Sequence, residues 1–440
     1  MRVAAAICAF AAFGARGVTR EEVARHYAPV LYEETDDPIK DLYSAFDFDG
    51  DWNGDNQAEN MECWSDASKC NTADNPSSRC AFQQCPLIAT IYYTVIETPT
   101  HWFIQYMPYH PLDWKITNGH ENDTESLMAV VAKGGGDFGK LQVIETRFHL
   151  YWYRYSADPA VSSGADVVNG PVHSEPVSGR PAFYVQMVGH GICGGFSPPN
   201  YLFPDLQLTC YHDQQPHIAN TGVVYSPDVV PVAMPVVASG RTVDAGYNLV
   251  ELLTSVWPHI HEIGPGKAFL SAIDYQGERC GQFDCPTQFG GAWEGNEGQS
   301  PGEPWAQPGG AGVNAVGDQF FDPAYTMSKR LTFPEPFSLD YCFNPFLNIA
   351  DSCAAVPDAG TPPDAGTTSD DAGAAPADAG AQSTDAGAAG ADAGGGGTIA
   401  PNARRGCNSG AAAGALAALV LAFALRRGRG SAARRNRPWP

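Results

Sequence analysis

Hydrophobic residues in the body of the chain gather in short runs rich in Val, Ile, Tyr, Phe and Trp, separated by Gly, Pro, Asn and Asp. This pattern is typical of β-strands. Helical periodicity is confined to residues 21–27 and 245–256. The Gly- and Pro-rich stretch 286–317 is predicted to be a long loop. The pattern indicates an all-β protein, a β-sandwich with long loops. The predicted strands are 87–98, 102–109, 127–133, 141–155, 182–188 and 222–224.

Both ends of the chain differ in composition from this body. After Met1 and Arg2, an unbroken Ala-rich apolar run covers residues 3–15 and is followed by charged residues, so residues 1–17 are predicted to be a secretory signal peptide. From 354 to 405, Asp-Ala-Gly repeats recur with Gly and Pro but without the Leu, Ile or Val that would fill a core. This segment is predicted to be a disordered, charge-extended linker.

Residues 406–440 are predicted to be a hydrophobic sorting or anchor tail. Cys407 precedes an apolar stretch at 410–425, and a cluster of arginines follows it. Sixteen helical residues rise about 24 Å, marginally short of a bilayer core, and the arginines would stay on the cytoplasmic side. The sequence therefore predicts an exported protein at the cell surface or outer membrane, with an ectodomain at 18–353 held to the membrane by its tail.

Ten of the twelve cysteines lie in the predicted ectodomain, apart from Cys8 and Cys407. An even number in an exported chain favours about five disulfides in an oxidising compartment. Zinc binding by the short spacings 80–85 and 280–285 is the alternative. The ten are Cys63, Cys70, Cys80, Cys85, Cys193, Cys210, Cys280, Cys285, Cys342 and Cys353.

The net charge is -23 and the sequence pI is about 4.7. Binding to nucleic acid phosphates needs clustered Lys and Arg, so this balance argues against a nucleic acid partner. Part of the negative charge lies in the linker and only solvates it. The remainder suits an exposed surface or the binding of cations.

The first candidate cation site is an acidic loop at residues 47–56. Oxygen-bearing side chains at alternate positions, with glycine turns, are what Ca²⁺ requires. The spacing departs from that of an EF-hand, because Asn60 stands where the bidentate Glu is needed. The alternative is a set of Asp, Asn and Gly turns that only bend the chain. The candidate ligands are Asp47, Asp49, Asp51, Asn53 and Asp55.

The second candidate site combines Asp113 with His120, Asp123 and Glu125 at the start of the apolar run 127–133. In an extended strand, Asp123 and Glu125 share one face and His120 can swing in from the turn before it. Carboxylates with one imidazole suit Ca²⁺, Mg²⁺ or Mn²⁺. The alternative is a polar strand end with solvated carboxylates.

The same segment carries a family resemblance. Residues 119–125 read Gly-His-Glu-Asn-Asp-Thr-Glu and resemble the Gly-His-Arg-His-Asp-Trp-Glu heptad of the necrosis- and ethylene-inducing peptide-like cytolysins. The resemblance to bacterial and fungal proteins similar to vacuolar protein sorting-associated protein sixty-two is wider and covers most of 25–335. It rests on residues 27–32, 110–114, 119–125, 189–191 and 317–324.

The resemblance implies a β-sandwich and a divalent cation held by His120, Asp123 and Glu125, with Asp113 as the fourth ligand. Residues 121, 122 and 124 differ from the cytolysin heptad, so toxin activity does not transfer. The C-terminal tail resembles the sorting tails of myxobacterial surface proteins, in which a membrane protease would cut near Cys407.

Three functions remain open from the sequence. The favoured one is a surface-anchored, cation-binding β-sandwich that binds an extracellular glycan, lipid headgroup or protein. The second is a secreted metal-dependent hydrolase in which His190 lines a ligand cleft as acid or base. The third is a cytolysin-like, membrane-attacking protein. No nucleophile elbow, zinc-protease helix or phosphate loop occurs in the sequence, so enzymatic activity is left uncertain and binding is favoured.

Overall fold

The computed structural model describes most of the predicted ectodomain. The predicted linker, the tail and all but the last residue of the signal peptide lie outside the described residues, as does the predicted loop at 286–317 except Gly317. Within the described part, no helix is long and apolar enough to cross a membrane. The described residues are 17–37, 39–52, 54, 56–70, 85–114, 120–149, 151–198, 209–233, 235, 237–259, 279, 282 and 317–353.

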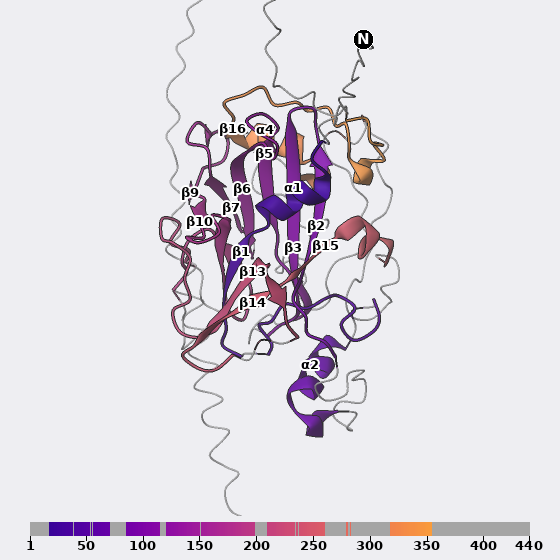
Figure 1. The fold of residues 1–440 in the computed structure, drawn as a ribbon, viewed down its shortest axis with the longest axis vertical. Coiled ribbons are helices and arrows are strands. Elements are labelled where there is room, and N and C mark those ends of the chain that lie inside the picture. The colour runs from indigo at the N-terminus through magenta and orange to yellow at the C-terminus, as the bar shows by residue number, and fades with distance from the viewer. Residues whose placement is uncertain are drawn as a thin grey trace, which may run out of the picture. The chain divides into compact units, whose positions relative to one another are not determined.

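Two mixed β-sheets form the frame (Figure 1). The smaller sheet has the strand order β10-β11-β1-β13-β14, with β12 paired to β11. Strand β1 runs parallel to β11 and antiparallel to β13 at its centre. The strands of this sheet are β1 (Val30–Glu34), β10 (His173–Ser174), β11 (Pro181–Val185), β12 (Ile192–Cys193), β13 (Gly222–Pro231) and β14 (Thr242–Gly246).

The larger sheet has the order β15-β2-β3-β5-β6-β7-β9, with β4 paired to the end of β3. A separate short ladder joins β16 (Leu331–Thr332) to β8 (Ser162–Ser163). The strands of the larger sheet are β2 (Thr90–Glu97), β3 (His101–Asp113), β4 (His120–Thr124), β5 (Leu127–Ala132), β6 (Lys140–Phe148), β7 (Tyr151–Ser156), β9 (Gly170–Pro171) and β15 (Asn248–Glu251).

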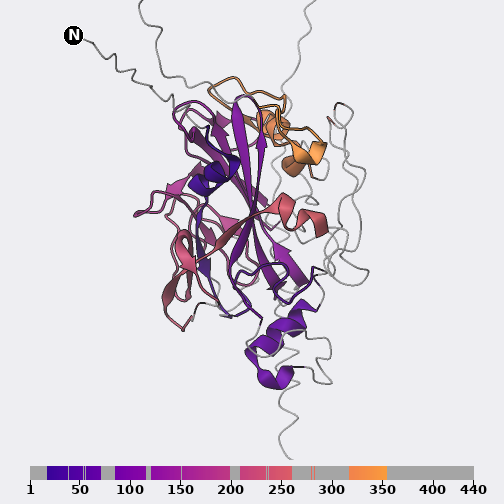
Figure 2. The same ribbon diagram turned by 45° about the vertical axis from the view of Figure 1, so that its right-hand side comes forward.

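Few helices accompany the sheets. Helix α1 begins with a capping box between Thr19 and Glu22, which satisfies backbone amides of its first turn. Helix α2 projects beyond one end of the sheets, away from α4 at the other end (Figures 1 and 2). The α-helices are α1 (Arg20–Tyr27), α2 (Gln57–Ser65), α3 (Asp318–Phe321) and α4 (Pro323–Arg330), and the 3₁₀ turns are η1 (Ala67–Lys69), η3 (Leu252–Thr254), η4 (Trp257–His259) and η7 (Pro345–Leu347).

Strand β3 is buried on both faces. Ile104 and Tyr106 join the core cluster that also holds residues of the smaller sheet, such as Leu31. Phe103 and Met107 point the other way, into a cluster with α3 and α4. Successive side chains of a strand alternate between its faces, so a strand covered on both sides reads as an almost continuous apolar run. The larger sheet is thus the middle layer of the fold.

The structure confirms the predicted all-β sandwich class and the helix at 21–27. The predicted strand 141–155 is two strands, because the chain turns at His149, whose φ is 53°. The predicted helix at 245–256 is wrong. Its residues belong to β14, β15 and η3, and β15 forms a parallel ladder with β2 from Asn248 to Glu251. Pairing with an existing sheet edge outweighs a weak helical periodicity.

Cysteine pairs confirm the disulfide-rich prediction. Disulfides join Cys63 to Cys70, Cys193 to Cys210, and Cys342 to Cys353. Cys85 is also disulfide-bonded, so it is not a zinc thiolate. The other cysteines of the predicted ectodomain, Cys80, Cys280 and Cys285, lie outside the described residues.

Candidate functional site

The β3–β4 hairpin carries the second predicted cation site. Its register places Asp113 opposite His120 and His110 opposite Asp123. The carboxylates are deeply buried, since Asp113 and Asp123 are each 1% exposed and Glu125 is fully buried. The side chain of His120 lies outside the described residues. The hairpin therefore holds three acidic side chains at a depth where charge is costly.

His190 lies between two of the buried carboxylates. Its Nδ1–H donates to Asp123 Oδ2 at 2.7 Å, and its Nε2 is 3.2 Å from Asp41 Oδ1. The residue has a left-handed backbone, with φ of 53°, and stands between two glycines that leave room for this turn. His190 is fully buried in the described structure, and its predicted role in lining a ligand cleft stays a prediction.

Asp41 is held in place by several donors. The Trp114 indole Nε1–H donates to Oδ1 at 2.8 Å, and the Val188 amide donates to the same atom at 2.9 Å. Backbone amides of residues 36–37 donate to Oδ2 at 2.8 and 3.0 Å. This carboxylate is fixed before any ligand arrives, and it fixes the loop that carries His190.

The charge state of His190 follows from these contacts. Burial by itself lowers the pKa of the imidazole, but the hydrogen bonds and negative charges of Asp123 and Asp41 outweigh it and raise the pKa to about 10. His190 is therefore an imidazolium at neutral pH. As such, it offsets part of the negative charge buried in the hairpin.

This shift predicts a stability that depends on pH. The unfolded-state pKa of His is about 6.5. In the folded state the pKa is about 10, so the interactions of the protonated imidazole stabilise the fold fully below pH 6.5. That contribution is lost as the pH rises toward 10. We expect urea denaturation of the metal-free protein to show a loss of roughly 3–5 kcal/mol between pH 6.5 and 10. His190→Gln should lack this slope. His101→Gln should keep it, because the pKa of His101 is lowered to about 4. Parallel pH profiles for the wild type and His190→Gln would contradict the assignment.

Glu33 and His110 complete the polar layer between the sheets. Both side chains are fully buried, and Glu33 Oε1 lies 3.5 Å from His110 Nε2. Burial raises the pKa of Glu33 well above its usual range, and burial together with the charge of His190 lowers the pKa of His110. The His110 ring stacks on that of His190, with centroids 3.5 Å apart and planes within 10°.

Glu125 lies at another part of the hairpin and makes different contacts. Its Oε1 accepts the His149 amide at 3.0 Å, and the His149 Nε2 is 2.6 Å from Gln186 Oε1. Its charge also acts on the buried Arg147 guanidinium. Glu125 thus anchors the tight turn between β6 and β7.

Three of the four predicted ligands have described side chains, and they lie on or directly beside the β3–β4 hairpin. Among the described residues, Asp113, Asp123 and Glu125 do not form a group whose ligand atoms all lie within 4.8 Å, whereas Glu33, His110 and His190 do. Sequence reasoning missed Glu33 and Asp41 as site residues. The sequence signal for Glu33 is its position directly after the apolar residues 30–32, which places a carboxylate at the end of a short apolar run. The cation ligands stay a prediction.

The predicted calcium loop is attached to the same hairpin. Asp49 Oδ2 accepts a hydrogen bond from Asn60 of α2 at 2.8 Å, so this oxygen ties the loop to the helix that follows it. The Asn122 side-chain amide donates to the Gly54 carbonyl at 2.7 Å, and the Tyr109 hydroxyl donates to Asn122 Oδ1 at 2.7 Å. Asn53 and Asp55 lie outside the described residues, and calcium binding there stays a prediction.

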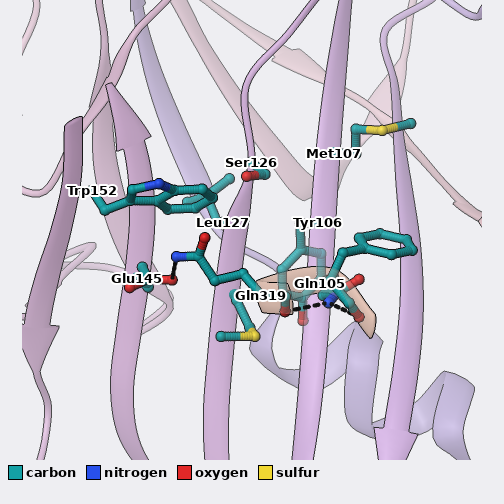
Figure 3. A pocket seen from close by; sticks show the side chains of 10 residues that line it. Gln105, Tyr106, Met107, Ser126, Leu127, Glu145, Trp152 and Gln319 are labelled. Atoms are coloured by element: carbon teal, nitrogen blue, oxygen red, sulfur yellow. Dashed lines mark hydrogen bonds between the residues drawn. The ribbon is translucent and has the colours of Figure 1, made fainter. Parts of the chain in front are cut away.

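A small pocket opens on the other face of the larger sheet (Figure 3). Its volume of about 30 Å³ admits about two water molecules. The Gln319 amide donates to Glu145 Oε1 at 2.8 Å, and the Gln105 amide donates to the Phe320 carbonyl at 3.0 Å. These bonds attach α3 to the sheet beside Trp152, so we interpret the pocket as a packing feature and not as a ligand cleft.

A scan of known protein-family models and a search of curated proteins find no match to this chain. Among solved structures, the chain resembles the non-toxic HaNLP3 protein at 14% identity and a TM-score of 0.25, covering 46% of this chain and 74% of that one. It also resembles Necrosis and Ethylene inducing Protein 2 from the causal agent of cocoa's Witches Broom disease. The sequence identity is 16% and the TM-score is 0.23, and the match covers 37% of this chain and 60% of that one. A third structure, described as a toxin fold for microbial attack and plant defense, matches at 16% sequence identity and a TM-score of 0.22. This match covers 44% of this chain and 71% of that one. The chain is thus similar in part to necrosis- and ethylene-inducing proteins, at scores that carry no argument about its activity.

Proposed function

We propose that this chain is an exported, surface-anchored β-sandwich that binds a divalent cation at its β3–β4 hairpin and, through this region, an extracellular glycan, lipid headgroup or protein. The observation that carries the proposal is the burial of Asp113, Asp123 and Glu125 in one hairpin. A buried carboxylate costs several kcal/mol unless charge and hydrogen bonds compensate it. His190 and the His149 amide supply part of that compensation, and a divalent cation would add to it.

The donor set favours a hard cation. Asp113, Asp123 and Glu125 offer oxygen atoms and His120 would add one imidazole, a combination that suits Ca²⁺, Mg²⁺ or Mn²⁺. Asp123 would serve both the ion and His190. Because these carboxylates are buried, the ion would act by fixing the hairpin, and the partner would bind the surface around it.

A hydrolytic role for His190 has no support from the geometry. A general acid or base has to reach the substrate directly or through one water molecule. His190 is fully buried, and the two carboxylates around it keep it protonated at neutral pH. Binding is therefore the better proposal.

Calorimetric titration of the chelator-stripped, full-length chain with Ca²⁺, Mg²⁺ and Mn²⁺ tests the proposal. We expect saturable binding by the wild type, and binding weakened at least about tenfold in Glu125→Gln, because one ligand oxygen is replaced by an amide. The exposed Glu335 offers a matched control, and Glu335→Gln should bind as the wild type does. If the wild type shows no saturable binding, the cation has to be removed from the proposal.

A further inference from the structure

We infer that Glu33, His110 and His190 form a second metal site, which holds a zinc-like ion between the two sheets. The proposal does not rest on the hairpin cation site, because it uses other ligands and a different class of metal. Glu33 comes from β1 of the smaller sheet, His110 from β3 of the larger sheet, and His190 from the loop before β12. An ion there would connect the two layers of the sandwich.

The polar atoms of Glu33 and His110 lack well-formed hydrogen bonds. All three side chains of the cluster are fully buried. The Tyr43 hydroxyl interacts with the Glu33 carboxyl, but neither oxygen of Glu33 and neither ring nitrogen of His110 makes a hydrogen bond of normal geometry within the described structure. Leaving a buried polar atom unsatisfied costs about 1–3 kcal/mol. Two of these atoms, Glu33 Oε1 and His110 Nε2, lie 3.5 Å apart, and we read them as a site that a bound species completes.

The distances suit a tetrahedral ion. The ligand atoms of the three residues all lie within 4.8 Å of one another, and Glu33 Oε1 is 3.5 Å from His110 Nε2. Two ligand atoms that are each about 2.1 Å from a tetrahedral ion stand about 3.4 Å apart. An ion can therefore lie between Glu33 and His110 without moving either strand.

One ring nitrogen of His190 has the carboxylate partner that metal-ligating histidines use. Its Nδ1–H donates to Asp123 Oδ2 at 2.7 Å, and such carboxylate–histidine contacts fix the tautomer and the ring orientation of metal ligands. Its Nε2 makes a longer contact of 3.2 Å, to Asp41. Because the rings of His110 and His190 are parallel, one of them has to turn about its Cβ–Cγ bond for both to reach the ion.

The donor set decides the class of metal. Two imidazoles and one carboxylate are the ligands of zinc sites, whereas Ca²⁺ and Mg²⁺ take mainly oxygen. An imidazole ligates through a deprotonated nitrogen, so the ion would replace the Nε2 proton of His190 and its contact with Asp41. Full burial also predicts that a bound ion exchanges slowly, so the protein should acquire it as it folds.

Metal content of the full-length chain tests the inference. Protein folded with Zn²⁺ and then dialysed against chelator should retain about one zinc ion per chain, and His110→Gln should retain at least about tenfold less. His101 is the matched control. It is also fully buried on β3, but its ring nitrogens bond to Thr100 and Gln142. His101→Gln should keep the zinc.

A spectroscopic measurement on the wild type decides the case even if a variant fails to fold. Co²⁺ supplied during folding should give the strong visible absorption of a tetrahedral site with nitrogen ligands. A wild type with neither retained zinc nor this spectrum overturns the inference, and zinc retained by a folded His110→Gln also overturns it. Glu125→Gln should keep the zinc, whether or not the hairpin binds a cation. Loss of the zinc in this variant would place the zinc at the hairpin and overturn a separate site.

Discussion

Replacing Asp123 with alanine is expected to lower the free energy of unfolding by about 3–5 kcal/mol, measured by urea denaturation at pH 7. The change removes the acceptor 2.7 Å from His190 Nδ1 and leaves a buried imidazolium with less negative charge around it. Uncompensated charge in the interior accounts for the size of the effect, since the two side chains are almost fully buried. The loss should exceed that caused by removing an exposed carboxylate.

The exposed Asp137 supplies that control, and Asp137→Ala should change stability by less than about 0.5 kcal/mol. The double variant Asp123→Ala/His190→Leu should recover much of the loss, because removing both partners of a buried pair costs less than removing one. The ion-pair explanation fails if the loss of unfolding free energy in the double variant equals the sum of the losses in Asp123→Ala and His190→Leu. The two residues would then act independently.

Arg330→Met is expected to destabilise the fold by about 3–5 kcal/mol, by the same principle, on the other face of the larger sheet. The fully buried Arg330 guanidinium is 3.1 Å from Glu145 Oε2 and 3.4 Å from Asp166 Oδ2. Arg154 contacts the same two carboxylates at 2.8 and 3.1 Å. Without Arg330, only Arg154 of this pair contacts the two carboxylates, and α4 loses its ion pair with Glu145 of β6.

The preceding residue in the chain provides the control. Lys329 is exposed, and Lys329→Ala should leave the midpoint of thermal or urea unfolding nearly unchanged. Equal effects of the two substitutions would show that loss of helix α4, and not the buried charge network, sets the stability of this region. A loss for Arg330→Met below about 1 kcal/mol would contradict the network as described.

Local sequence patterns were sufficient for most of the larger sheet. The apolar runs at 102–109 and 127–133 correspond to β3 and β5 within a few residues. Strand β3 is covered on both faces, so its run is long and easily seen. Strand β1 was missed because its five residues include two consecutive glutamates, a composition that indicates a surface. Tertiary packing buries both of them, at 0% and 1% exposure.

Sequence spacing likewise predicts only part of the candidate site. The spacing of His120, Asp123 and Glu125 is enough to single out this segment, because carboxylates that open an apolar strand are unusual. Sequence spacing could not show that His190 lies against Asp123, since 67 residues separate them. Nor could it show that Glu33, on a strand of the other sheet, faces His110 across the sandwich.

By itself, the sequence determined the all-β class, the main strands of the larger sheet and the richness in disulfides, because strand periodicity and cysteine content are local properties of a chain. Only the tertiary structure decided which polar groups meet. The charge of His190, the closeness of Glu33 to His110 and the anchoring of α4 by Arg330 depend on strands and loops from distant parts of the chain. Burial then sets their energies, since a charge that is inexpensive at the surface becomes costly between two sheets.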